Sequence, residues 1–139
     1  MSAYPFKALP GSASKLLAKS TPVSSLALSR IRRHRTIFIS DTHLGTRGCK
    51  ADRLADFLAH NDCATLYLIG DIVDGWALKR NWYWPEAHNR VVAEILRKVE
   101  SGTRVIYVPG NHDEALRDYT GISLAGVELQ PEAIHKTAD

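Results

Sequence analysis

Apolar and polar residues follow two different periods along the chain. Continuous apolar runs at residues 36–40, 65–69 and 103–108 predict buried β-strands. In residues 50–60 and 86–100 the apolar positions recur at helical spacing, so each segment has one apolar face. Strands that alternate with helices predict right-handed crossovers and a parallel sheet. The pattern therefore predicts an α/β fold.

The pattern beyond the third strand is weaker. It predicts a short helix at 114–119 and short strands at 127–129 and 133–137. Residues 1–34 are rich in Ser, Ala, Leu and Pro without sustained periodicity, so we expect a disordered basic leader before a domain at 35–139. A transit peptide and a basic tether to anionic lipid are alternative interpretations of this leader.

Composition and charge restrict where the protein is expected in the cell and which partners it is expected to bind. No apolar run approaches the ~20 residues that cross a bilayer, and Cys49 and Cys63 are too few for a disulfide framework. Residues 1–35 hold seven Lys or Arg and no acid, whereas the rest holds eleven basic and fifteen acidic residues. The domain is therefore mildly acidic, and we expect no nucleic-acid partner. We expect a cytoplasmic protein, with peripheral contact at the inner membrane as an alternative; the oligomeric state stays open.

Three polar motifs stand where the predicted strands end. They are Asp41-Thr42-His43, Gly70-Asp71-Ile72-Val73-Asp74 and Gly110-Asn111-His112-Asp113. Parallel sheets bind ligands beyond the carboxyl ends of their strands, which is where all three motifs fall. Each motif alone has a structural explanation, such as an Asx turn or a helix cap. All three in order favour a ligand site.

The residue types predict a metal centre. Asp41 and His43 are two residues apart, and in extended structure their side chains would point the same way. Asp71 would supply a carboxylate able to bridge two ions, and Asn111 a neutral oxygen. Such a mixed set of oxygen and nitrogen ligands suits Mn, Fe, Zn or Mg. Two such ions activate water and stabilise phosphoryl oxygens. We expect two divalent ions, with Mn preferred.

A second pair of residues predicts acid–base chemistry. His112 would protonate the leaving oxygen or stabilise charge that develops on phosphorus, and Asp74 would fix its tautomer. Gly70 and Gly110 allow tight exits from the strands. His88 is expected on the polar side of the second helix, without a chemical role.

Other residues near the strand ends are candidates for substrate binding. Trp76 belongs to an aromatic cluster that packs a core or lid, or forms an apolar wall for substrate. Basic side chains near the motifs would bind a diphosphate, or else are solvated surface; these are Arg47, Lys79 and Arg80.

With these motifs the chain resembles the calcineurin-like metallophosphoesterases, whose pattern is DxH, GDxxD, GNH[DE], a later His and GHxH. Residues 36–119 carry the first three motifs. The resemblance implies a layered α/β sandwich. It also implies that Asp41, His43 and Asp71 serve one metal, that Asp71 and Asn111 serve the other, and that His112 with Asp74 is catalytic.

Within this superfamily, residues 38–45, 70–76 and 108–114 resemble the bacterial UDP-2,3-diacylglucosamine pyrophosphohydrolases of lipid A synthesis. The chain departs from that pattern in carrying His112 where those enzymes have Arg. The resemblance implies a metal-dependent phosphoesterase or pyrophosphohydrolase, with a UDP-sugar lipid as the first substrate. A phosphoprotein, cyclic nucleotide or dinucleotide is the alternative substrate.

The later His and the GHxH motif of the family do not occur in the sequence, in which His135 is the last histidine. We therefore expect the N-terminal part of a truncated domain. A shortened gene product, a fragment, and a domain completed by another chain are the explanations. A non-catalytic remnant with an incomplete metal site is the rival hypothesis to an enzyme.

Overall fold

The computed structural model describes residues 30–137, and they form one sheet with helices. The described chain runs through β1 (Arg32–Ser40), α1 (Ala51–His60), β2 (Asn61–Ile69), α2 (Gly75–Arg80), α3 (Glu86–Glu100), β3 (Arg104–Val108), a 3₁₀ helix (Glu114–Tyr119), β4 (Ser123–Leu124) and β5 (Val127–Leu129).

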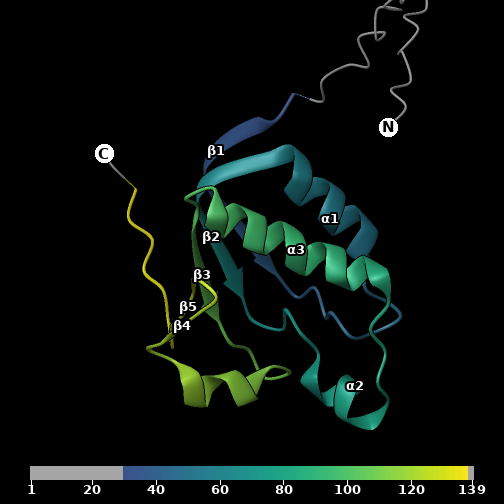
Figure 1. Cartoon of the computed structure of the whole chain (residues 1–139). Helices are drawn as coiled ribbons and strands as arrows, with labels where there is room; N and C mark the ends of the chain where they lie inside the picture. Colours follow the sequence, from purple (N-terminus) through teal and green to yellow (C-terminus); the bar gives the residue numbers. More distant parts are fainter. Residues whose placement is uncertain (1–29, 138–139) are drawn as a thin grey trace, which may run out of the picture.

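The sheet has five strands in the order β1-β2-β3-β5-β4 (Figure 1). β1 pairs with β2, β2 with β3 and β3 with β5, all in parallel, and only β4 is antiparallel to its neighbour. The chain therefore reaches the same edge of the sheet each time a parallel strand ends. This confirms the predicted α/β fold with a parallel sheet.

The helices α1 and α3 lie side by side over one face of this sheet (Figure 1). Ile37, Leu66 and Val105 point into the core from three neighbouring strands, where Leu58 of α1 and Val91 of α3 meet them. Leu58, Leu66, Val91 and Val105 have no exposed surface. Burial of such side chains stabilises each by roughly 1.5–3 kcal/mol, so this layer fixes the strand ends in place.

The opposite face of the sheet is also apolar in part. Phe38, Tyr67 and Ile106 stand in register on adjacent strands, and the rings of Phe38 and Tyr67 stack with centroids 4.9 Å apart. His135 places its ring edge-on against both aromatic rings. Residues 133–137, where a strand was predicted, are not paired in the sheet. That prediction was wrong: His135 packs against the face of the sheet, and Ile134 is 77% exposed instead of pairing with a neighbouring strand.

The structure adds elements that the hydrophobic pattern did not predict. β1 and β2 each begin four residues before their apolar runs, because Arg32 pairs with Asn61 in a polar part of the sheet. The six residues of α2 are too few for a periodic signal, and the Asp74 carboxylate caps the helix by accepting from Ala77 N at 2.7 Å. The helix predicted at 114–119 is a 3₁₀ helix.

Most of the expected leader, residues 1–29, lies outside the described part of the chain, and residues 32–34 belong to β1. None of the helices within residues 30–137 has the length and apolar character needed to cross a bilayer.

A buried lysine joins α3 to the beginning of β2. Lys98 has no exposed surface, and its ammonium donates to the Asn61 carbonyl at 2.5 Å and to the Asp62 carboxylate at 3.0 Å. A buried charge is tolerated only when it is paired and hydrogen-bonded. This contact lies at the end of β2 away from the polar motifs, so it serves stability.

We expect Lys98→Ala to lower the free energy of unfolding by about 3 kcal/mol, because it removes buried methylenes and the ion pair together. Lys98→Met keeps most of the apolar stem and should lose only about 1–2 kcal/mol. Urea unfolding followed by circular dichroism measures both. Two variants that unfold like the wild type would contradict the stabilising role of this lysine.

Candidate metal centre

Backbone hydrogen bonds continue past the strands and hold the three motif loops together. Asp41 N donates to Gly70 O at 3.1 Å, and His43 N donates to Asp71 O at 2.9 Å. Gly70 N donates in turn to Val108 O at 2.7 Å. The loops are thus an irregular extension of the parallel ladder from β1 through β2 to β3. The main chain, rather than side-chain contact alone, sets the separation of the motifs.

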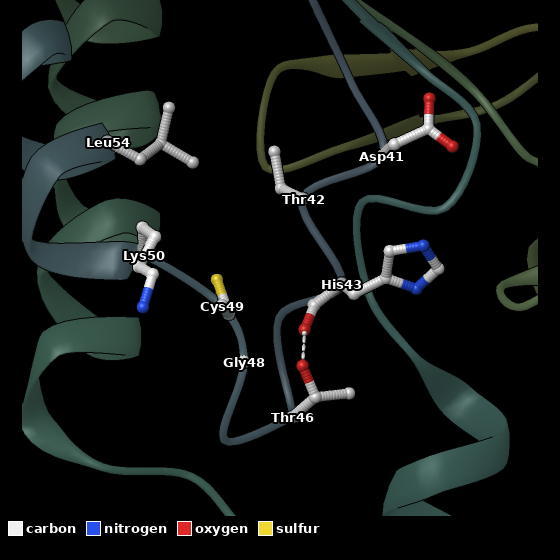
Figure 2. A pocket seen from close by; sticks show the side chains of 8 residues that line it. All are labelled: Asp41, Thr42, His43, Thr46, Gly48, Cys49, Lys50 and Leu54. Atoms are coloured by element: carbon white, nitrogen blue, oxygen red, sulfur yellow. Dashed lines mark hydrogen bonds between the residues drawn. The ribbon is translucent and has the colours of Figure 1, made fainter.

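Three motif residues have an unusual backbone conformation, and two of them, Asp41 and His43, were expected to be extended. Asp41, His43 and Asp71 have φ values of 50°, 49° and 51°, in the left-handed region. This conformation is uncommon for residues other than glycine and concentrates at functional sites. The explanation that Asp41 and His43 share a direction because the chain is extended was therefore wrong. Figure 2 shows that both side chains nevertheless point to one side of the chain, away from Lys50 and Leu54.

Asp41, His43 and Asp71 come together as a group of metal-ligand type. Each offers one ligand atom, and these three atoms lie within 4.8 Å of one another. Two carboxylates and an imidazole suit a divalent cation such as Mn²⁺, Fe²⁺, Zn²⁺ or Mg²⁺. Asp71 Oδ1 accepts from His112 N at 2.8 Å, which leaves Oδ2 for an ion. The donor set therefore fits a divalent metal.

Asn111 lies between two residues that contact Asp71. His112 follows it, and Gly110 precedes it in close contact with the same aspartate. Its side chain is exposed. The backbone of Asn111 therefore lies next to residues that contact Asp71, and its role as a ligand of a second ion stays a prediction.

Asp74 stands between two imidazoles, not one. Its Oδ2 lies 3.0 Å from His112 Nδ1 and 3.2 Å from His43 Nδ1, and the rings of the two histidines meet edge to face. These three residues form a second group whose ligand atoms lie within 4.8 Å. An ionised Asp74 favours protonated Nδ1 on both rings and leaves both Nε2 atoms available.

The electrostatics of Asp74 support its ionised form. Burial of this carboxyl, which is only 6% exposed, favours the neutral acid. Hydrogen bonds from the Ala77 amide, His112 and His43 outweigh this effect and hold the pKa of Asp74 below its ordinary value. The charge is therefore present throughout the neutral range.

Trp76 covers part of the His112 imidazole. The two ring centroids are 4.4 Å apart with the planes tilted by 34°, and the indole N–H points to Glu114 Oε1 at 3.4 Å. The indole keeps 41% of its surface exposed. It therefore borders the imidazole and solvent at the same time.

Asp113 is a residue whose role the sequence did not reveal. It precedes the 3₁₀ helix, yet its buried side chain does not cap that helix. Its carboxylate accepts from Ile72 N at 2.9 Å, from Gly110 N and from the Tyr107 hydroxyl. Burial of the Tyr107 phenol, together with this carboxylate, raises the tyrosine pKa strongly. One carboxylate thus joins the loop after β2 to the loop after β3.

Gly110 is required by the distance between these loops. A Cβ atom on Gly110 would lie 2.4 Å from Asp71 Oδ1 and 2.6 Å from Asp71 N, closer than real atoms approach. The predicted need for glycine at this exit therefore has a specific cause, which is the contact with a candidate metal ligand.

His88 differs from the prediction of a polar-facing residue. It is 1% exposed, and its Nδ1 accepts from Gly45 N at 3.2 Å. Tyr83 and Trp84 place their rings edge-on against it. Burial lowers the pKa of His88, so the neutral imidazole anchors the loop that carries His43.

The candidate substrate-binding residues separate into two places. Trp76 lies at His112, whereas Arg47 and Arg80 line a pocket of about 290 Å³ with Tyr83. Lys79 is exposed and does not line that pocket. A different pocket of about 440 Å³ borders Asp41, His43 and Thr46 on the α1 side of the loop (Figure 2).

We expect Asp113→Asn to weaken Mn²⁺ binding about tenfold, because one of the loop amides would lose its acceptor and the ligands would be less well held. It should also lower the free energy of unfolding by about 2 kcal/mol. Calorimetric titration and urea unfolding measure the two effects. Asp118→Asn, an exposed change in the 3₁₀ helix that follows Asp113, is the control. Equal Mn²⁺ affinity in both variants would refute the positioning role.

Comparison with known proteins gives one family match. The sequence pattern of the calcineurin-like phosphoesterases matches residues 34–132. No curated protein matches the chain. Among solved structures, the crystal structure of the nuclease MPE from Pseudomonas putida is similar, with 18% sequence identity and a TM-score of 0.41. The match covers 68% of this chain and 46% of that one, so this chain spans less than half of that protein.

Proposed function

The chain belongs to the calcineurin-like phosphoesterases, and on this premise we propose that it takes part in metal-dependent hydrolysis of a phosphoester or pyrophosphate. One observation carries the proposal. Asp41, His43 and Asp71, from the ends of two parallel strands, offer ligand atoms within 4.8 Å of one another, and His112 follows the third strand beside them.

The proposed metal ligands are Asp41, His43, Asp71 and Asn111. Their oxygen and nitrogen donors support a centre for two divalent ions, with Mn²⁺ as the first candidate and Fe²⁺, Zn²⁺ or Mg²⁺ as alternatives. Ions bound there would act as Lewis acids toward water and the phosphoryl oxygens.

His112 is the proposed acid that protonates the leaving oxygen. Its Nδ1 faces Asp74 at 3.0 Å, so the other ring nitrogen is available to deliver a proton. Asp74 orients the ring, and its lowered pKa keeps the carboxylate ionised as an acceptor for Nδ1 of the imidazole. Because the same carboxylate also faces His43, the ligand and the acid are oriented together.

The proposed substrate is a pyrophosphate of the UDP-sugar lipid type. It is supported by the resemblance of residues 38–45, 70–76 and 108–114 to the UDP-2,3-diacylglucosamine pyrophosphohydrolases. The exposed indole of Trp76 beside His112 supplies an apolar wall for such a leaving group.

We expect Asp71→Ala to abolish Mn²⁺ binding and His112→Ala to retain it, since Asp71 is a ligand in this proposal and His112 is not. Calorimetric titration with MnCl₂ measures both, and circular dichroism controls for folding. Loss of binding in the His112 variant would refute the division of roles, and unchanged binding in the Asp71 variant would refute the metal centre.

The activity is tested with Mn²⁺ and a substrate panel of a UDP-sugar lipid, bis-p-nitrophenyl phosphate, a cyclic nucleotide, a dinucleotide and a phosphopeptide. We expect hydrolysis of the pyrophosphate, and a loss of about 10²–10⁴-fold in its rate in His112→Ala. Cleavage of the phosphopeptide alone would exclude the lipid substrate. Mn²⁺ binding without hydrolysis of any substrate would favour a non-catalytic chain.

A further inference from the structure

We propose that Arg47 and Arg80 form a second anion site, next to the metal-ligand loop, that takes the distal phosphoryl group of a diphosphate. Both line a pocket of about 290 Å³ together with Gly45, Thr46, Ala77, Asn81 and Tyr83. No carboxylate belongs to this lining, so its charge is wholly positive. The role in substrate binding rests on the proposed function, whereas the binding of an anion does not.

The two guanidinium groups are available to a ligand. Within residues 30–137 neither forms an ion pair with a carboxylate, unlike Arg90, Arg97 and Arg104, which all do. Arg47 places its Cζ 4.6 Å from the centre of the Tyr83 ring. Stacking of this kind fixes the plane of the guanidinium and leaves its N–H edge free for bidentate contact with phosphate.

The surrounding residues hold this site in place. His88 accepts from the Gly45 amide and packs against the Tyr83 ring, so one buried side chain anchors both the loop of Arg47 and its stacking partner. Gly45 also lies against Leu78 of α2, where an added Cβ would come within 2.7 Å of Leu78 Cγ. This contact sets the loop of Arg47 against the helix that carries Arg80.

One residue, Thr46, connects this pocket to the loop of a candidate metal ligand. Thr46 lines this pocket and also the pocket that Asp41 and His43 border. Its backbone N–H and its hydroxyl both donate to the His43 carbonyl, at 3.2 and 2.9 Å. The loop that carries His43 thus also carries Arg47, and in this proposal the reacting phosphoryl group lies at the metal ligands and a second phosphoryl group at Arg47 and Arg80. This geometry favours diphosphates over simple monoesters.

The test is calorimetric titration of the full chain with inorganic pyrophosphate in the presence of EDTA, which removes any metal. We expect the wild type to bind, and Arg47→Met and Arg80→Met each to weaken binding roughly fivefold. Arg53→Met, which removes the same charge from an exposed position on α1, is the matched control and should bind like the wild type. Circular dichroism of each variant checks folding.

Three results would overturn the proposal: no binding of pyrophosphate by the wild type, wild-type affinity in both pocket variants, or an equal loss in Arg53→Met. In a second measurement with Mn²⁺, the pocket variants should raise KM for a nucleoside diphosphate sugar and leave KM for bis-p-nitrophenyl phosphate unchanged. A chain that binds pyrophosphate through these arginines but hydrolyses neither substrate would retain the anion site and refute the proposed function.

Discussion

The close contact between the loops after β2 and β3 is the constraint on which the candidate site depends. Gly110 lies so near Asp71 that no side chain fits between them, and the amide of His112 donates to the same aspartate. Asp113 accepts hydrogen bonds from both loops. If the loops moved apart, Asp71 would lose its fixed orientation, and Asp74 and His112, which face each other across this contact, would separate. The orientation of the candidate site residues therefore depends on the packing of these two loops.

The same loop contact also places the charge of the Asp74 carboxylate between two imidazoles. One buried carboxylate caps α2 and also faces the imidazoles of His43 and His112. A buried charge is costly by itself, and these three contacts compensate for its loss of water. As a result, a structural feature, the start of a short helix, fixes the orientation of a candidate ligand and a candidate acid. A change at this position would therefore affect folding together with the proposed metal binding and proton transfer.

The parts of the fold that the sequence predicted are those with a clear period. The three apolar runs become parallel strands, and residues 86–100 form α3 as predicted. The polar beginnings of β1 and β2 and the six residues of α2 were missed, because pairing with a neighbour and a capping carboxylate leave no apolar signal. Residues 133–137 were misread as a strand, since a short run of this composition does not require pairing, and here His135 packs on the face of the sheet.

The same reasoning explains what could be predicted of the site. Asp41, His43 and Asp71 were selected because polar residues of ligand type follow strands, and the parallel sheet brings them together. Their left-handed backbone was not foreseen, because residue type alone does not fix φ at positions other than glycine. The roles of His88 and Asp113 were missed because they arise from burial. An imidazole or carboxylate that orients a loop has the same local sequence as one exposed to water, and only the packing around it distinguishes the two.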